Sequence, residues 1–196
     1  MGRDKALLPL GERSFLEHLA AVLDGEVEPL VVVLGHHADQ IEQQVRLPAA
    51  ARILRNPDHQ LGQLSSLHVA LRFLAGRGAE GALVCLVDHP AVTKQAVRAL
   101  LARFQQTHPT ILIPTWRGRR GHPVLFSSRV FDELLDAPLA QGARFVVRRH
   151  TEEVETVDVG EEGIVWDVDR PEDYAALESR WAALSRAEPE PAEGRS

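Results

Sequence analysis

Carboxylates near apolar runs are the first residues in this sequence that could do chemistry. Asp88 is the first charged residue after the apolar run ALVCLV, and a carboxylate at the end of a buried strand suits a Mg²⁺ ion that accompanies phosphates. Asp167 and Asp169 lie in WDVDRPEDY, where the alternation of a strand points both side chains the same way. These residues predict a divalent-metal site. Lys5, in the segment MGRDKALLPLG, is the basic residue that could accompany it.

Each carboxylate also has a structural interpretation. Asp88 could cap the turn that follows it. Asp169 precedes Pro171 and Glu172, a typical signature of a helix N-terminus, so it could serve as a helix cap. The residues alone leave both alternatives open, and one aspartate can cap a helix and still bind a metal.

Two polar stretches are further candidates. In NPDHQLGQLSSL, Gly62 precedes a predicted helix whose first turn carries Ser65 and Ser66, and the free backbone N–H groups there suit the polar groups of a nucleotide. The basic loop RGRRGHP, residues 117–123, could attract phosphates or lie solvated on the surface. Trp116 is the one aromatic residue near this loop, so nucleic-acid binding is not expected.

Composition excludes several classes of protein. The chain has 196 residues, 44% hydrophobic and 26% charged, with a formal net charge of −6, so a nucleic-acid coat protein is not expected. No apolar run approaches the roughly 20 residues of a membrane span, and a cytoplasmic location with no membrane partner is expected. We expect one domain over residues 1–186 and a disordered tail over residues 187–196. The lone cysteine, Cys85, is predicted to be buried, and the histidine spacings do not fit zinc.

Elements that could position these residues alternate along the chain. Apolar runs predict strands, and periodic segments predict helices, in an order typical of a mainly parallel sheet covered on both faces. The later strands are shorter and predict edge or antiparallel positions. The predicted strands are Leu30–Leu34, Ala51–Leu54, Ala82–Asp88, Thr110–Ile113, Val124–Phe126, Val154–Val159 and Ile164–Val168. The predicted helices are Ala38–Val45, Leu64–Leu74, Val92–Phe104, Asp132–Leu135, Ala143–Arg149 and Pro171–Leu184.

These motifs together resemble a known family. From Met1 to about Leu184 the chain resembles the MobA-like nucleotidyltransferases, most closely the molybdenum cofactor cytidylyltransferases of the MocA type. The family signature L-A-A-G-x-S-x-R-M-G-x-x-K-x-L-L-P survives here as MGRDKALLPLG. The matches that follow in order are NPD with its glycine and Ser-Ser-Leu (Asn56–Leu67), LVDHP (Leu86–Pro90), GHPVLF (Gly121–Phe126) and DVDRPEDY (Asp167–Tyr174).

The resemblance implies a fold, a reaction and a role for each matching residue. The implied fold is a three-layer, Rossmann-like, doubly wound α/β fold with a mostly parallel sheet, of the nucleotide-diphospho-sugar transferase type. Lys5 would contact phosphates, and Asp88 and Asp169 would bind Mg²⁺. The residues expected near the nucleotide or the acceptor are Gly62, Ser65, Ser66, Gly121, His122 and Pro123. The implied reaction transfers CMP from CTP to molybdopterin and releases pyrophosphate.

The sequence also departs from the family pattern. The family's first strand and the glycine-rich segment that holds the triphosphate have no counterpart here, and the missing strand would lie between Leu30–Leu34 and Ala82–Asp88. We therefore expect an N-terminally truncated member of the family whose start codon was assigned too late. Alternatives are GMP transfer to the same cofactor, sugar-phosphate nucleotidyl transfer, and a non-catalytic remnant that binds molybdopterin or a client molybdoenzyme.

Overall fold

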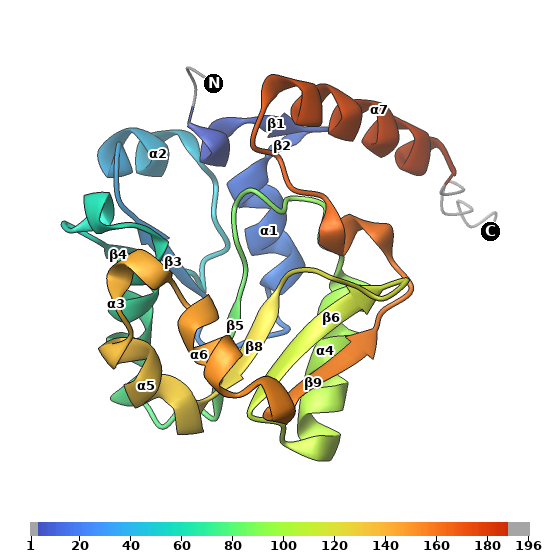
Figure 1. The fold of residues 1–196 in the computed structure, drawn as a ribbon. Coiled ribbons are helices and arrows are strands. Elements are labelled where there is room, and N and C mark those ends of the chain that lie inside the picture. Colours follow the sequence, from blue (N-terminus) through green and yellow to red (C-terminus); the bar gives the residue numbers. More distant parts are fainter. Residues whose placement is uncertain (1–3, 188–196) are drawn as a thin grey trace, which may run out of the picture.

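A computed structural model describes residues 4–187 and the side chains of residues 4–182 (Figure 1). The strands are β1 (Pro9–Leu10), β2 (Arg13–Ser14), β3 (Val31–Leu34), β4 (Arg52–Arg55), β5 (Gly81–Val84), β6 (Ile111–Trp116), β7 (Arg119–Arg120), β8 (Val124–Ser127) and β9 (Val154–Asp158). The α-helices are α1 (Phe15–Leu23), α2 (Ala38–Gln44), α3 (Gln63–Ala75), α4 (Lys94–Thr107), α5 (Phe131–Asp136), α6 (Arg144–Arg149) and α7 (Pro171–Ala187). Short 3₁₀ helices include η1 (Lys5–Leu7), η2 (His59–Leu61) and η6 (Glu162–Val165).

The strands form three separate sheets. The largest has the order β5-β8-β6-β7, and β9 pairs parallel with β6. Strand β8 runs antiparallel to both of its neighbours. Strands β3 and β4 form a parallel pair of their own, and β1 and β2 form a small hairpin. Helices and strands alternate as the sequence predicts, so the α/β class is confirmed.

Helices cover both faces of the large sheet, as the alternation of buried residues along β6 requires. Ile111 and Ile113 pack with α3, α5 and α6, whereas Leu112, between them, packs with Leu100 and Phe104 of α4. Successive side chains of a strand point to opposite faces, so each face of β6 is buried against helices. The result is the expected three-layer arrangement of helices, sheet and helices (Figure 1).

Helix α7 packs against the N-terminal segment of the chain. Its side chains Tyr174, Leu177 and Trp181 pack on an apolar cluster that contains Leu8 and Phe15. The Tyr174 hydroxyl also donates a hydrogen bond to the Pro9 carbonyl oxygen, 3.0 Å away. The predicted apolar stripe of this helix is therefore confirmed for these three residues, while the side chain of Leu184 lies outside the described part of the chain. Of the predicted tail over residues 187–196, Ala187 belongs to α7 and residues 188–196 lie outside the described residues.

One predicted strand is wrong over part of its length, and another is wrong over all of it. The run Ala82–Asp88 is paired only as far as Val84, because its partner β8 begins at Val124, directly after a proline that has no N–H to donate. The run Ile164–Val168 forms the end of η6 and an irregular segment, whose Val168 N–H donates to the Asp88 carbonyl oxygen at 2.9 Å.

Strand β8 fits the prediction of an edge or antiparallel position, because it runs antiparallel to both β5 and β6, although it lies in the interior of the sheet. All four of its residues are buried between β5 and β6. Strand β9 also fits this prediction, because it lies at the edge of the sheet, where it pairs parallel with β6.

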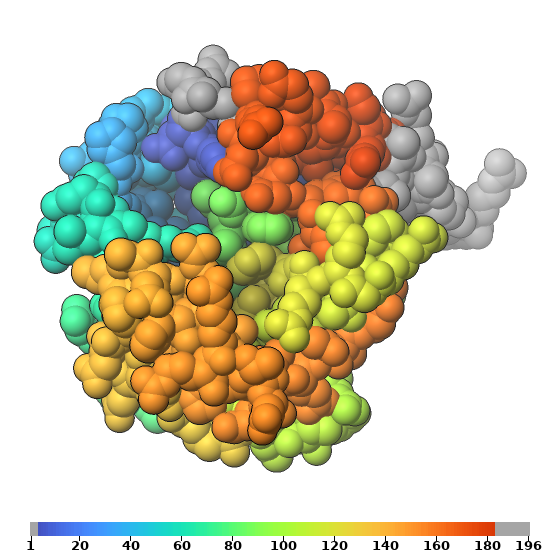
Figure 2. All heavy atoms as spheres, in the orientation of Figure 1, coloured from blue at the N-terminus to red at the C-terminus, as the bar shows by residue number. Residues whose placement is uncertain are grey.

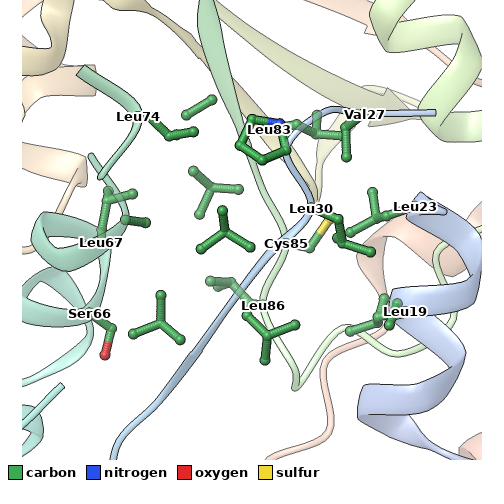
Figure 3. A pocket seen from close by; sticks show the side chains of 18 of the residues that line it. Leu19, Leu23, Val27, Leu30, Ser66, Leu67, Leu74, Leu83, Cys85 and Leu86 are labelled. Atoms are coloured by element: carbon green, nitrogen blue, oxygen red, sulfur yellow. The ribbon is translucent and has the colours of Figure 1, made fainter. Parts of the chain in front are cut away.

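An apolar slot separates β3 from β5. Its volume is about 400 Å³, and residues of α1 and α3 line it along with the two strands (Figure 3). Cys85 lies in this lining as a free thiol among apolar neighbours, and burial raises its pKa to about 12. The apolar surroundings agree with the prediction of a small apolar residue, but Cys85 is only partly buried, because it lines the slot. Among the described residues, no helix is long and apolar enough to cross a membrane.

Candidate active site

Three charged residues from distant parts of the sequence meet beyond the end of β5. Lys5 lies in η1, Asp88 follows β5, and Asp169 lies just before α7. The Lys5 Nζ atom is 2.6 Å from Asp169 Oδ1 and 3.8 Å from Asp88 Oδ2. The structure thus brings together the charged residues that the sequence assigned to one site. Figure 2 shows this face of the molecule as hollowed, with the green segment recessed between its neighbours.

Asp169 pairs with Lys5 and does not cap α7. The carboxylate that accepts hydrogen bonds at the start of this helix belongs to Asp173, which receives the backbone N–H groups of Asp169 at 3.2 Å and Arg170 at 2.8 Å. The hydrogen bond from Lys5, together with its charge, lowers the pKa of Asp169. The capping interpretation of the Asp169 side chain is therefore wrong, and its carboxylate is available to the site.

The Asp88 side chain does not cap the following helix either. Helix α4 is capped by Thr93, whose hydroxyl accepts the Ala96 N–H at 3.1 Å. The Oδ1 atom of Asp88 is buried and has no hydrogen-bond partner among the described residues. A buried carboxylate oxygen without a partner is costly, and a cation bound to that oxygen would remove the cost.

Asp88, His89 and Asp167 form a compact set of metal-ligating groups. Their ligand atoms all lie within 4.8 Å of one another. Burial, followed by the negative charge of Asp88, raises the pKa of Asp167. Within the described part of the chain, the Nδ1 atom of His89 is buried without a partner, as is Asp88 Oδ1. Two carboxylates and one imidazole fit a divalent ion such as Mg²⁺ or Mn²⁺.

The cluster differs from the predicted ligand pair of Asp88 and Asp169. Asp167 takes part in it, whereas Asp169 is engaged by Lys5. The segment after η6 is irregular and pairs with no strand, so the alternation that would have aligned Asp167 with Asp169 does not apply. Sequence reasoning did not select His89, although its place between Asp88 and Pro90 was a usable signal.

The Gly121-His122-Pro123 segment forms the wall behind His89. A Cβ atom on Gly121 would lie 2.3 Å from the Ile164 carbonyl oxygen, so glycine is required there by packing. The rings of His89 and His122 have their centroids 4.5 Å apart. Burial, and after it the neighbouring His89, lower the pKa of His122 to about 4, which leaves the ring neutral at pH 7. Its Nδ1 atom is buried without a partner among residues 4–182 and can accept one hydrogen bond.

The residues before and in the first turn of α3 that were expected near a nucleotide have different surroundings in the structure. Gly62, with φ of 97°, adopts a backbone conformation that favours glycine just before the helix. Ser65 is buried, and its hydroxyl lies 2.7 Å from the Gly62 carbonyl oxygen and 2.8 Å from Asn56 Nδ2. Ser65 thus holds the loop. Ser66 shares the amide of Asn56 at 3.0 Å and lines the same slot as Asp88.

Comparison with known proteins defines the class. The family model described as the MobA-like NTP transferase domain matches residues 1–154. Together with the α/β fold and the charged site, this match identifies a nucleotidyltransferase. The chain belongs to the MobA-like NTP transferase domain family.

Individual relatives agree with this assignment. The chain is 31% identical over 146 residues, 74% of this chain and 69% of the relative, to a probable molybdenum cofactor guanylyltransferase of Mycobacterium ulcerans strain Agy99. It is also similar to the crystal structure of an Rv0371c homologue from Mycobacterium sp. strain JC1, with a TM-score of 0.80, 31% identity, and coverage of 94% and 91% of the two chains. A manganese complex of Rv0371c from Mycobacterium tuberculosis H37Rv gives a TM-score of 0.70 at 26% identity, with coverage of 91% and 93%.

Proposed function

We propose that this protein transfers GMP from GTP to molybdopterin and releases pyrophosphate, with a divalent metal ion as cofactor. The observation that carries the reaction type is the approach of Lys5 to Asp88 and Asp169 beside the ligand atoms of His89 and Asp167. The choice of guanine rests on the relatives, which are described as molybdenum cofactor guanylyltransferases. The manganese complex of a similar protein supports a divalent cofactor.

The arrangement suits nucleotidyl transfer because this reaction needs alignment and charge neutralisation. The attacking phosphate oxygen is ionised at neutral pH, so no general base is required to activate it. Lys5 would exchange its carboxylate partners for phosphate oxygens of the nucleotide. Asp88, Asp167 and His89 would hold the metal ion, which neutralises phosphate charge when bound.

The relatives favour guanylyl transfer over the cytidylyl transfer expected from the sequence. The expectation of CMP transfer rested on the Gly121-His122-Pro123 match. In the structure, the close approach of Gly121 to the Ile164 carbonyl gives that glycine a packing role, which is independent of the base. Binding to a client molybdoenzyme stays a prediction.

The product of a competition reaction tests this proposal. The purified chain is incubated with molybdopterin, Mg²⁺ and equal concentrations of GTP and CTP, and the products are identified by mass spectrometry. We expect molybdopterin guanine dinucleotide and pyrophosphate, and neither product with Asp88→Asn. A cytosine dinucleotide would overturn the choice of base. Molybdopterin binding without any dinucleotide would favour the non-catalytic remnant.

A further inference from the structure

A crevice bordered by β7, η6 and α7 lies next to the metal-ligating cluster. Asp167 lines this crevice and also belongs to the cluster with Asp88 and His89. Figure 2 shows the yellow-green hairpin segment that contains β7 beside the orange segment that contains η6. The volume of the crevice is about 270 Å³, below the roughly 300–1,000 Å³ of pockets that enclose a whole drug-sized ligand. The crevice therefore suits one group of a ligand, close to the proposed reaction centre.

The crevice contains hydrogen-bond donors that lack an acceptor. Arg119 lines it, is exposed, and has no ion pair among residues 4–182. Trp166 lines it as well, and its Nε1 atom is buried without a hydrogen-bond partner in the described part of the chain. A guanidinium and an indole N–H can only donate hydrogen bonds. A ligand group that is rich in acceptor oxygens therefore fits this lining.

The carboxylates of the crevice are already engaged, so they do not neutralise Arg119. Glu162 Oε1 lies 3.7 Å from Arg180 Nη1. Asp173 accepts two backbone N–H groups at the start of α7. Asp167 belongs to the metal-ligating cluster, where a bound cation would offset its charge. Among the described lining residues, Arg119 is thus the one cation without a carboxylate partner, and the unmatched charge favours an anionic ligand group.

The proposed reaction requires a cation at such a place. Nucleotidyl transfer brings the phosphate of the acceptor against a phosphate of the nucleotide, and two anions in contact repel each other. Lys5 is the one basic side chain among residues 4–182 in ion-pair contact with Asp88 or Asp169, and the nucleotide would engage it. A second cation is therefore needed for the acceptor. The planar guanidinium of an arginine matches the geometry of phosphate oxygens.

We propose that the crevice binds the phosphate group of the acceptor and that Arg119 is the side chain that holds it. The inference rests on the proposed function for the identity of the acceptor, molybdopterin. The neighbouring residue provides a matched control. Arg119 and Arg120 are both exposed and pair with Trp116 and Thr115 of β6, but successive side chains of a strand point to opposite faces. Only Arg119 of the two lines the crevice.

Equilibrium dialysis of molybdopterin against the full chain tests the proposal. The wild type is compared with Arg119→Met and Arg120→Met, each with Mg²⁺ and without nucleotide. Methionine removes the charge and keeps an unbranched side chain. We expect Arg119→Met to bind molybdopterin at least about tenfold more weakly, because a charge-assisted hydrogen bond is lost. Arg120→Met should weaken binding by less than about threefold, and both variants should keep the melting temperature of the wild type.

Molybdopterin from which a phosphatase has removed the phosphate provides the second arm. The wild type and Arg119→Met should bind this ligand equally, since the group that Arg119 holds is gone. Equal losses in the two arginine variants would overturn the proposal, as would a difference that persists with the dephosphorylated ligand. Weaker binding of GTP but not of molybdopterin by Arg119→Met would also overturn it, because the phosphate would then belong to the nucleotide.

The readout separates this site from the proposed function. A chain that binds molybdopterin through Arg119 but forms no dinucleotide would retain the site and lose the proposed function. A chain whose Arg119→Met variant forms the dinucleotide with an unchanged KM for molybdopterin would retain the function and lose the site. Absence of molybdopterin binding by the wild type would overturn the proposal as well.

Discussion

Replacing Lys5 by methionine tests the electrostatic basis of the proposed reaction. Methionine keeps most of the length of the side chain and removes its charge. The Lys5 Nζ atom lies 3.8 Å from Asp88 Oδ2, and we take this as the distance at which it would meet a phosphate oxygen. Two unit charges about 4 Å apart interact by about 4 kcal/mol at an effective dielectric constant of about 20. In the free protein Lys5 already pairs with Asp169 and Asp88, so only part of this energy is gained when it meets the nucleotide, and we expect kcat/KM to fall by about 10²–10³-fold.

The fold should tolerate this change. Asp169, the nearest partner of Lys5, is 64% exposed, and ion pairs with exposed partners contribute little to stability. We therefore expect an unchanged melting temperature for Lys5→Met, measured by thermal denaturation. Activity is measured as GTP-dependent pyrophosphate release with molybdopterin, and Lys5→Arg is the matched control because it keeps the charge. A loss in Lys5→Met below about tenfold, or an equal loss in Lys5→Arg and Lys5→Met, would refute the electrostatic argument.

Two further predictions concern stability. Gly121→Ala should lower the free energy of unfolding by at least about 1–3 kcal/mol in chemical denaturation, because the new Cβ atom would lie 2.3 Å from the Ile164 carbonyl oxygen; Gly76→Ala, with no atom closer than 4.0 Å, is the control and should change it little. For His150, burial alone would lower the pKa, but hydrogen bonds with Glu153 and Glu133 raise it overall. A raised pKa stabilises the fold fully at pH values below the pKa of the unfolded state, and this contribution is lost as the pH rises through the pKa of the folded state. The stability advantage of the wild type over His150→Gln should therefore shrink between pH 6 and pH 8. An advantage that stays constant over this range would contradict the assignment.

The sequence predicts where the helices and strands lie better than it predicts which strands pair with one another. Apolar runs and helical periodicity locate most of the strands and helices, because burial on one or two faces leaves a direct pattern in the residues. They do not reveal that β8 lies in the interior of its sheet, since an apolar run such as its four buried residues is compatible with a central or an edge position. They also do not locate the end of β5, which depends on the proline that precedes the partner strand at Val124.

The candidate site was predictable where charge follows an apolar run, and less so elsewhere. Asp88 follows such a run, and Lys5 and Asp169 meet it in space as the resemblance implied. The place of Asp167 beside His89 depends on the irregular backbone after η6, and on the hydrogen bond from Val168 to the Asp88 carbonyl. Such long-range backbone contacts leave no periodic signal in a single sequence.

Metal binding tests the central claim most directly. Electron paramagnetic resonance of Mn²⁺ can count the ions bound per chain for the wild type and for Asp88→Asn, each with saturating GTP. If Asp88, His89 and Asp167 hold the ion, the wild type binds one Mn²⁺ tightly, and Asp88→Asn weakens this binding by about tenfold or more while its melting temperature is unchanged. Equal Mn²⁺ affinity in the two proteins would contradict the account, because the ion would then lie away from the carboxylate cluster.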